Sequence, residues 1–340
     1  MKHTNLLRLL KRGLIVGVVS AALTGVAQAE VVVRIGQQYW PGMSIIAQGD
    51  GTLDAAFAEL GAKAEYTYTS NGADMNVAMA AGAIDIAMLG TVPAMVAVVN
   101  GLPIEIIYLN GIIGSIEALV AREGINSVEE LKGKKIAAPF NTTSHFAVIA
   151  ALEVHGLSVD DVELVDLSPP DTVPAFARGD VDAVFVWDPH KARLIDEFGA
   201  KLLYDSVQLD RDTGGKAAIY DLTYAHEDFI REHPELVNAY IRIMDETLIA
   251  YRKDPGPGNA QIMPLMGAKS IADVEAAAGG ILFTTAQEQV DDGSMDKIAI
   301  LLSETAKFFL GAGQIERAPS LEEFQYSINR NPLYNYVASQ

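Results

Sequence analysis

The chain has 340 residues, with 44 acidic and 25 basic side chains, a net charge of −19 and no cysteine. Such an acidic surface repels nucleic acid and anionic lipid, and the lack of cysteine excludes a disulfide framework and a thiolate metal site. The length suits two domains, each large enough to bury its own core.

The first 29 residues have the pattern of a secretory signal. Lys2, Arg8, Lys11 and Arg12 are followed by an apolar run that ends in the small residues Ala27-Gln28-Ala29, as a cleavage site requires. A membrane anchor is the alternative, but spanning takes ~20 apolar residues and this run is shorter. We expect cleavage near Ala29 and a periplasmic protein, free rather than tethered because no cysteine can carry a lipid.

The first half alternates short strand-like runs with helical patterns, which predicts parallel sheets with crossover connections. Lys63–Thr69, for example, alternates polar and apolar residues with the period of two that is typical of a strand. The expected strands are Val31–Ile35, Lys63–Thr69, Ile84–Leu89 and Ile104–Leu109, and the expected helices are Leu53–Leu60, Asn71–Ala81 and Val92–Asn100.

The same order restarts after residue 114. Ser127–Lys132 predicts a short helix that opens on a serine N-cap. Strands are expected at Lys135–Ala138, Val162–Leu167 and Val181–Trp187, and helices at Thr142–His155 and Asp171–Arg178.

The two halves also share a sequence echo. Gly82–Leu89 (GAIDIAML) lies 97 residues before Gly179–Val186 (GDVDAVFV), and each has a glycine followed by an aspartate in an apolar strand. That offset is too long for a solenoid repeat and suits two similar α/β lobes.

Beyond the second half the pattern predicts only helices and a Tyr/Asn-rich tail. Helices are expected at Pro234–Arg252, stopped by the Pro/Gly run that follows Asp254, and at Ile271–Ala278 and Met295–Leu310. We expect 30–114 plus 222–340 to form lobe I and 115–221 to form an inserted lobe II. The crossing segments, near Ile112–Ala121 and Thr213–Ala225, would make a two-segment hinge.

Ligands of parallel α/β sheets lie beyond the carboxyl ends of the strands, at helix N-termini. Three turns at such places join hydroxyl or amide side chains to free N–H groups, which can hold an anion without a cation. Plain N-capping is the alternative for each. The turns contain Ser70 and Asn71, Gly90 and Thr91, and Thr142, Thr143, Ser144 and His145.

Five further residues are candidates for the same cleft. The echo places Trp187 and Asp188 at a strand end, where Trp187 would stack on a ligand and Asp188 would either contact it or cap the helix after Pro189. Tyr39-Trp40 follows the first strand, in a turn that faces the cleft or packs in the core. Asp221, in an apolar strand, needs a partner such as a ligand ammonium, a lysine or a backbone amide.

Several of these segments resemble the periplasmic taurine-binding proteins of ABC importers, within the wider sulfonate, nitrate and thiamine-precursor binding group. The resemblance spans essentially the whole chain after the signal. Its densest parts are Glu117–Val120, Lys132–Phe140, Thr143–His145, Val186–Pro189, Asp221 and Phe229–Glu235.

The resemblance implies a type II periplasmic binding protein, with two α/β lobes that close on a ligand in the cleft between them. It implies that Thr143, Ser144 and His145 face the sulfonate, that Asp221 holds the amine and that Trp187 forms a wall. The ligand-binding set expected from pattern and resemblance together is Gln37, Tyr39, Trp40, Ser70, Asn71, Gly90, Thr91, Glu117, Thr142, Thr143, Ser144, His145, Trp187, Asp188 and Asp221.

The chain departs from its relatives at two places: Tyr39-Trp40 stand where relatives carry smaller residues, and Asp188 where some carry alanine. Two aromatics and two acids would also suit a larger ammonium group. A different amine or an alkanesulfonate therefore remains an alternative ligand, and a sensing adaptor for a membrane sensor an alternative role.

The partners that the resemblance implies are a taurine-like small molecule and the permease and ATPase of an importer. We expect a monomer that binds no nucleic acid and holds no cofactor or metal. We expect no enzyme, because no Gly-x-Ser-x-Gly, His-Glu-x-x-His or phosphate-loop motif is present.

Overall fold

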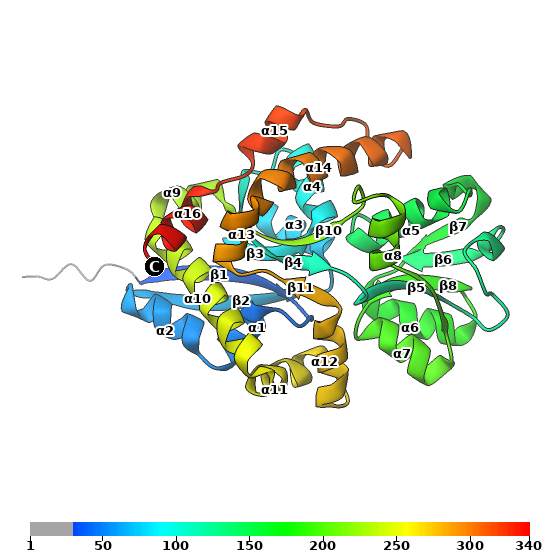
Figure 1. Cartoon of the computed structure of the whole chain (residues 1–340), viewed down its shortest axis with the longest axis horizontal. Coiled ribbons are helices and arrows are strands. Elements are labelled where there is room, and N and C mark those ends of the chain that lie inside the picture. The colour runs from blue at the N-terminus through cyan, green and yellow to red at the C-terminus, as the bar shows by residue number, and fades with distance from the viewer. Residues whose placement is uncertain (1–29) are drawn as a thin grey trace, which may run out of the picture. The chain divides into compact units, whose positions relative to one another are not determined.

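The computed structural model describes residues 30–340, and the predicted signal lies outside this range. Val31–Gln340 form one compact unit. None of the helices in the described range has the length and apolar character needed to cross a membrane. The strands of this unit form two separate sheets, one of six strands and one of five (Figure 1).

The six-stranded sheet has the order β11-β4-β10-β3-β1-β2. Strands β1 and β2 are parallel, as are β1 and β3, whereas β10 runs antiparallel to both β3 and β4. Its strands are β1 (Val31–Gln38), β2 (Ala62–Thr69), β3 (Ile86–Gly90), β4 (Ile104–Ile113), β10 (Ile219–His226) and β11 (Ile281–Phe283).

The five-stranded sheet has the order β7-β6-β8-β5-β9, with β5 antiparallel to β8 and β9. It therefore repeats the pattern β2-β1-β3-β10-β4 of the other sheet, including the one reversed strand. Its strands are β5 (Glu117–Ala121), β6 (Lys135–Ala138), β7 (Glu163–Asp166), β8 (Ala183–Trp187) and β9 (Lys201–Asp205).

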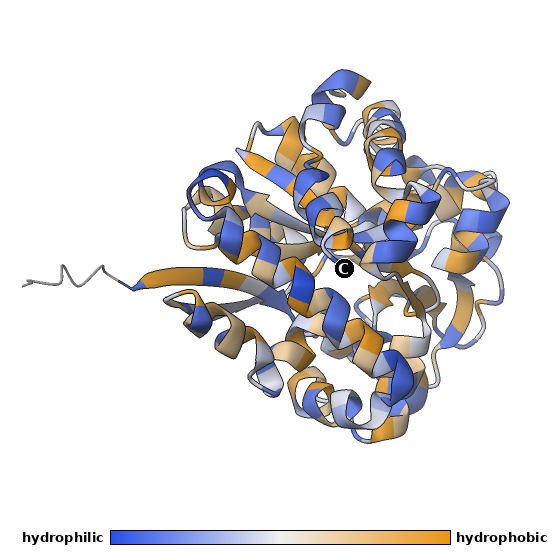
Figure 2. Ribbon diagram, turned by 60° about the vertical axis from the view of Figure 1, so that its left-hand side comes forward, coloured by the Kyte–Doolittle hydropathy of each residue, from blue (hydrophilic) through white to orange (hydrophobic). Residues whose placement is uncertain are grey.

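Helices cover both sheets and alternate hydrophilic with hydrophobic residues along their length (Figure 2). We call each sheet with its helices a lobe. The helices are α1 (Met43–Gly49), α2 (Thr52–Glu59), α3 (Gly72–Ala80), α4 (Thr91–Val99), α5 (Thr143–Val154), α6 (Pro169–Arg178), α7 (His190–Phe198), α8 (Ser206–Asp212), α9 (Glu227–Glu232), α10 (Pro234–Lys253), α11 (Pro255–Met266), α12 (Ile271–Gly279), α13 (Ala286–Asp292), α14 (Ser294–Gly311), α15 (Leu321–Tyr326) and α16 (Asn331–Ala338), with 3-10 turns at Glu129–Leu131 and Val159–Asp161.

The two halves repeat each other in atomic detail at the echoed aspartates. Asp85 accepts a hydrogen bond from the backbone N–H of Arg34 in β1, at 2.8 Å. Asp182 accepts one from the backbone N–H of Lys135 in β6, at 2.9 Å. Each aspartate thus ties the start of one lobe's third strand to its first, so the echo marks equivalent positions.

The predicted fold class is confirmed, with a correction to the sheets. They are mixed rather than parallel, because β10 and β5 carry the chain between the lobes and enter each sheet in the reverse direction. The chain passes from β4 to β5 and later returns to β10. The lobe boundaries at 114/115 and 221/222 stay a prediction; β10 begins before the second of them.

One local prediction was incomplete and two were wrong. The Pro/Gly run after Asp254 ends α10 but also begins α11, because Asp254 caps Gly256 N–H at 3.1 Å and proline suits the first helical position. A short strand, β11, interrupts the expected helical region, and the tail ends in α16. The turn at Glu129–Leu131 has Val128, not Ser127, as its N-cap residue.

Candidate ligand-binding site

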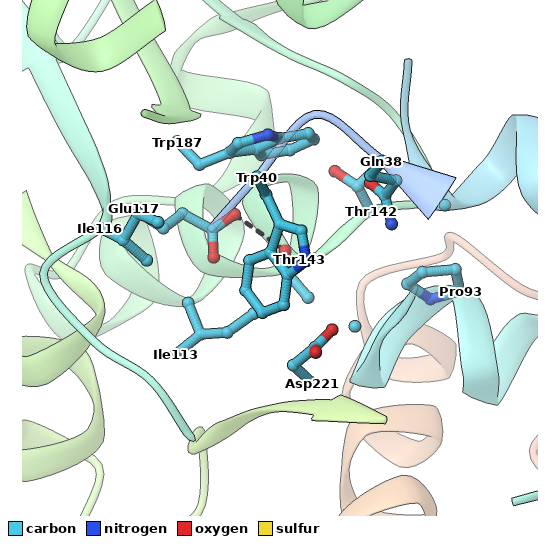
Figure 3. A pocket seen from close by; sticks show the side chains of 12 residues that line it. Gln38, Trp40, Pro93, Ile113, Ile116, Glu117, Thr142, Thr143, Trp187 and Asp221 are labelled. Carbon is cyan, nitrogen blue, oxygen red and sulfur yellow. Dashed lines mark hydrogen bonds between the residues drawn. The ribbon is translucent and has the colours of Figure 1, made fainter. Parts of the chain in front are cut away.

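A pocket lies where the carboxyl ends of strands from both sheets meet (Figure 3). Side chains from both lobes line it, so a ligand inside would touch both. The lining residues are Gln38, Trp40, Gly72, Gly90, Pro93, Ile113, Ile116, Glu117, Thr142, Thr143, Trp187 and Asp221.

Two buried carboxylates face this pocket from equivalent positions of the two sheets. Asp221 on β10 lies opposite Gly90, the last residue of β3, whereas Glu117 on β5 lies opposite Trp187, the last residue of β8. Gly90 and Trp187 are separated by the 97 residues of the echo. Each lobe therefore presents one acid, from its reversed strand, to the shared pocket.

Only one carboxylate oxygen of Glu117 accepts hydrogen bonds from the described residues. Its Oε1 accepts hydrogen bonds from the hydroxyls of Thr143, at 2.8 Å, and Ser144, while its buried Oε2 has no partner among the described residues. Burial raises the pKa of Glu117 to about 7, against the opposing effect of these hydroxyls and of Lys191. The carboxyl is thus balanced between its neutral and charged forms near neutral pH.

Asp221 has even fewer neighbouring groups that favour its charged form. The residue is 3% exposed, and its Oδ2 is buried without a hydrogen-bond partner in the described part of the chain. Burial raises the pKa of Asp221 well above its ordinary value, opposed only by the neighbouring amide of Asn110. An unpaired buried carboxylate is costly, so this position is ready to receive a cationic or hydrogen-bond-donating group.

The remaining walls are aromatic and apolar. Trp40 is buried, and its indole N–H points to the Met88 sulfur at 2.9 Å; Trp187 lines the other lobe's side. Among the described residues that line the pocket, none is a lysine or an arginine. Positive potential in the pocket therefore comes from helix N-termini and, at Glu117, from Lys191 outside the lining.

The three helix-start turns differ from one another. At α3, Asn71 is a plain N-cap that accepts from Asp74 N–H at 3.0 Å. At α4 and α5, the N-cap residues Gly90 and Thr142 make no side-chain cap hydrogen bond, and both line the pocket. These two N-termini can hold an anion through backbone N–H groups.

Several expected ligand residues near the first lobe lie outside the pocket lining. Gln37 is fully buried and bonds Ser44 and Gln48, and Tyr39 stacks on Tyr68 with ring centroids 4.9 Å apart. Ser70 bonds Asp74 at 2.6 Å. Thr91 exchanges hydrogen bonds with the backbone of Tyr220.

Three further expected residues outside the lining belong to the second lobe: Ser144, which lies behind Glu117, His145 and Asp188. His145 stacks on Phe140 at 4.2 Å and meets Phe309 edge-on; burial lowers its pKa to about 4. Asp188 pairs with Lys191 at 2.9 Å and accepts from Ala192 N–H at 3.0 Å, so it contacts the first turn of α7, although the N-cap residue of this helix is Pro189.

Trp40, Gly90, Glu117, Thr142, Thr143, Trp187 and Asp221 are the expected residues that the structure brings together. Five lining residues were missed in sequence. Pro93 lies in the expected helix Val92–Asn100 and Ile113 in the expected crossing segment Ile112–Ala121, but nothing local marks an apolar side chain as a pocket wall. The five are Gln38, Gly72, Pro93, Ile113 and Ile116.

The two mixed sheets share the order of five strands, are joined by two chain crossings and have the pocket between them. This arrangement defines the fold of a type II periplasmic binding protein. The alkanesulfonate-binding protein from Xanthomonas axonopodis pv. citri, solved bound to MOPS, shares this fold with a TM-score of 0.74 at 20% identity, covering 89% of this chain and 100% of that one. A mutant of the desulfurization enzyme DSZB, in complex with biphenyl-2-sulfinic acid, shares it with a TM-score of 0.65 at 16% identity, covering 92% and 100%. The fold therefore accommodates both binding proteins and an enzyme.

The chain belongs to the NMT1/THI5-like family, whose pattern matches residues 56–256. Among curated proteins, it is 32% identical to the taurine-binding periplasmic protein of Escherichia coli (strain K12), over 304 residues that cover 87% of this chain and 92% of that one.

Proposed function

We propose that this chain is the solute-binding component of an ABC importer and captures taurine or a similar small aminosulfonate. Its resemblance to a taurine-binding periplasmic protein along most of both chains supports the class of ligand. The observation that carries the proposal is the pair of buried acids, Glu117 and Asp221, each with an open oxygen in a pocket without a basic side chain.

The two acids favour a ligand with a primary ammonium. In the proposed complex the ammonium lies between Glu117 Oε2 and Asp221 Oδ2 and donates a hydrogen bond to each. An alkanesulfonate without an amine would bring only negative charge to two carboxyls, which is unfavourable in a buried site. A quaternary ammonium would bring the charge but no N–H donors, and both oxygens would stay unsatisfied.

The sulfonate end is assigned to the N-termini of α4 and α5. Their backbone N–H groups carry the positive ends of the helix dipoles and are not capped by side chains. Thr143 and Ser144, which the resemblance implies as hydroxyl donors to the sulfonate, already donate to Glu117. Backbone amides would therefore bind the anion, while these hydroxyls position the acid.

The mechanism is closure of the two lobes around a ligand that contacts both. An ammonium shared by β5 and β10 links the lobes directly, so it favours the closed state over an open one. Driving such an equilibrium from 1:99 to 99:1 takes about 5.5 kcal/mol of differential binding. The closed form would deliver the ligand to the permease in the periplasm, after cleavage of the signal near Ala29.

Calorimetry with matched ligands tests the proposal. Taurine should bind, whereas ethanesulfonate (without the amine) and ethylamine (without the sulfonate) should each bind at least about 100-fold more weakly, as expected when buried charged partners are left unpaired. N,N,N-trimethyltaurine is the control for charge without N–H donors and should also be weaker. Ethanesulfonate or the trimethyl compound binding as tightly as taurine would contradict the proposed ligand class.

A further inference from the structure

Gly90 ends β3 and precedes α4, and its backbone does not need a glycine. Its φ of −73° and ψ of 169° are extended values that any L-residue adopts. The reason for a glycine must therefore lie in the space around it. That space is in the pocket, which Gly90 lines from the six-stranded sheet.

A side chain at position 90 would collide with one atom of the opposite lobe. A Cβ on Gly90 would lie 2.4 Å from Cγ2 of Thr143, and the next nearest atoms, also of Thr143, are 3.7 Å away. A contact of 2.4 Å between carbons is far inside the ~3.5–4.0 Å optimum. The methyl group of Thr143 thus occupies the space that an alanine at position 90 would need.

Thr143 cannot easily turn its methyl away. It is the first residue of α5, and its hydroxyl donates to Glu117 Oε1 at 2.8 Å. A rotation of this side chain would give up that buried hydrogen bond. The contact between Gly90 and Thr143 therefore joins the six-stranded sheet to a helix of the other lobe at the pocket.

We infer that Gly90 is the residue that lets the lobes close, by receiving the methyl group of Thr143 against its bare Cα. The inference rests on the proposed function, because closure matters through the ligand that it encloses. An added methyl at position 90 would hold the lobes apart at the pocket without touching either acid. The backbone N–H of Gly90, at the start of α4, would still be present for an anion.

A double-mutant cycle tests this inference with taurine as the probe in calorimetry. Overpacking a tight contact predicts that Gly90→Ala weakens taurine binding by roughly 5- to 150-fold. Thr143→Ser removes only Cγ2 and keeps the hydroxyl that binds Glu117. In the Thr143→Ser background, Gly90→Ala should therefore cost less than about threefold. An equal loss in both backgrounds would overturn the inference, because the new methyl would then act on the ligand and not on Thr143.

Gly279→Ala is the control for a glycine-to-alanine change, because a Cβ there meets no atom within 4 Å; it should bind taurine like the original chain. A second measurement keeps the inference separate from the ligand. The chain has no cysteine, so spin labels on Val77→Cys in one lobe and Leu202→Cys in the other report their distance specifically.

In Gly90→Ala, the shortest distances between the two spin labels should become less populated, with and without taurine. Adding Thr143→Ser to this variant should restore them. An original chain that does not bind taurine would refute the proposed function only, since the distances still decide the role of Gly90. Identical distance distributions in the original chain and in Gly90→Ala would refute the closure inference, whatever ligand binds.

Discussion

Replacing Asp221 by asparagine should have opposite effects on the free and the ligand-bound protein. Asp221 is 3% exposed and its Oδ2 has no partner within the described range. Leaving such a group buried and unsatisfied costs about 1–3 kcal/mol, so Asp221→Asn should raise the stability of the free protein by an amount of this order. In the complex, it removes the charge that pairs with the ammonium, at a cost of about 2–5 kcal/mol or roughly 30- to 5,000-fold in affinity.

The pH dependence of this stability gain has a definite sign. The folded-state pKa of Asp221 is raised by burial, so folding takes up a proton once the pH exceeds the unfolded pKa of ~3.9. The destabilising effect of Asp221 is therefore absent near pH 3 and grows as the pH rises toward the folded pKa. The advantage of Asp221→Asn should be small at pH 4 and larger at pH 7.

Thermal unfolding with and without taurine measures both effects, with Asp245→Asn as a matched control. Asp245 is also a buried carboxylate, but it is satisfied by Ala286 N–H at 2.6 Å and by the Tyr336 hydroxyl at 3.1 Å. Its replacement should lower the melting temperature and leave taurine affinity unchanged. A melting temperature of Asp221→Asn that also falls, or an unchanged taurine affinity in that variant, would refute the reasoning.

The remaining predictions concern Glu117, His145 and Lys269. Because burial raises the pKa of Glu117 to about 7, binding an ammonium should release protons, and taurine affinity should therefore rise between pH 6 and 8. This rise should be smaller in Glu117→Gln. Calorimetry in buffers of different ionisation enthalpy measures the number of protons released. The pKa of His145 is lowered to about 4, so His145 should make the fold less stable as the pH falls from about 6.5 toward 4. His145→Phe should reduce this loss of stability in acid unfolding and keep taurine affinity within about twofold of the original chain. Lys269 forms an exposed ion pair with Glu197 at 2.9 Å. Lys269→Ala should change taurine affinity by less than about twofold at any salt concentration. A tenfold change would show that this ion pair contributes to closure of the lobes.

The sequence allowed most helices and strands to be placed, because their apolar periodicity and capping residues are local signals. The direction of β10 and β5 is not local: it depends on which lobe the chain has just left. The Pro/Gly run after Asp254 has the composition of a stop and was predicted as one, yet Asp254 with Pro255 is also a good helix start. Composition alone does not say which of these meanings applies.

The candidate site was predictable where strand ends determine it and unpredictable where long-range contacts do. Trp187 and Gly90 follow from the echo and from the rule that ligands bind beyond strand ends. The hydroxyls of Thr143 and Ser144 turn to Glu117, which is 26 and 27 residues away in the chain. No local pattern encodes that contact, on which we base the proposal that these hydroxyls position an acid rather than donate to the ligand.

The pseudo-symmetry of the two lobes also explains why the cleft suits a cation. Equivalent reversed strands place Asp221 and Glu117 on opposite sides of one pocket, so closing the empty cleft brings two carboxyls, each with one unpaired oxygen, into a common buried space. Burial raises the pKa of both carboxyls, so the unfavourable interaction of their charged forms with the buried surroundings opposes closure. A ligand ammonium reverses the sign of that interaction, whereas the equivalent strand ends, Gly90 and Trp187, differ in size and shape the space around it. In the proposed mechanism, the cation is thus the electrostatic condition for closure, and the glycine is its steric condition.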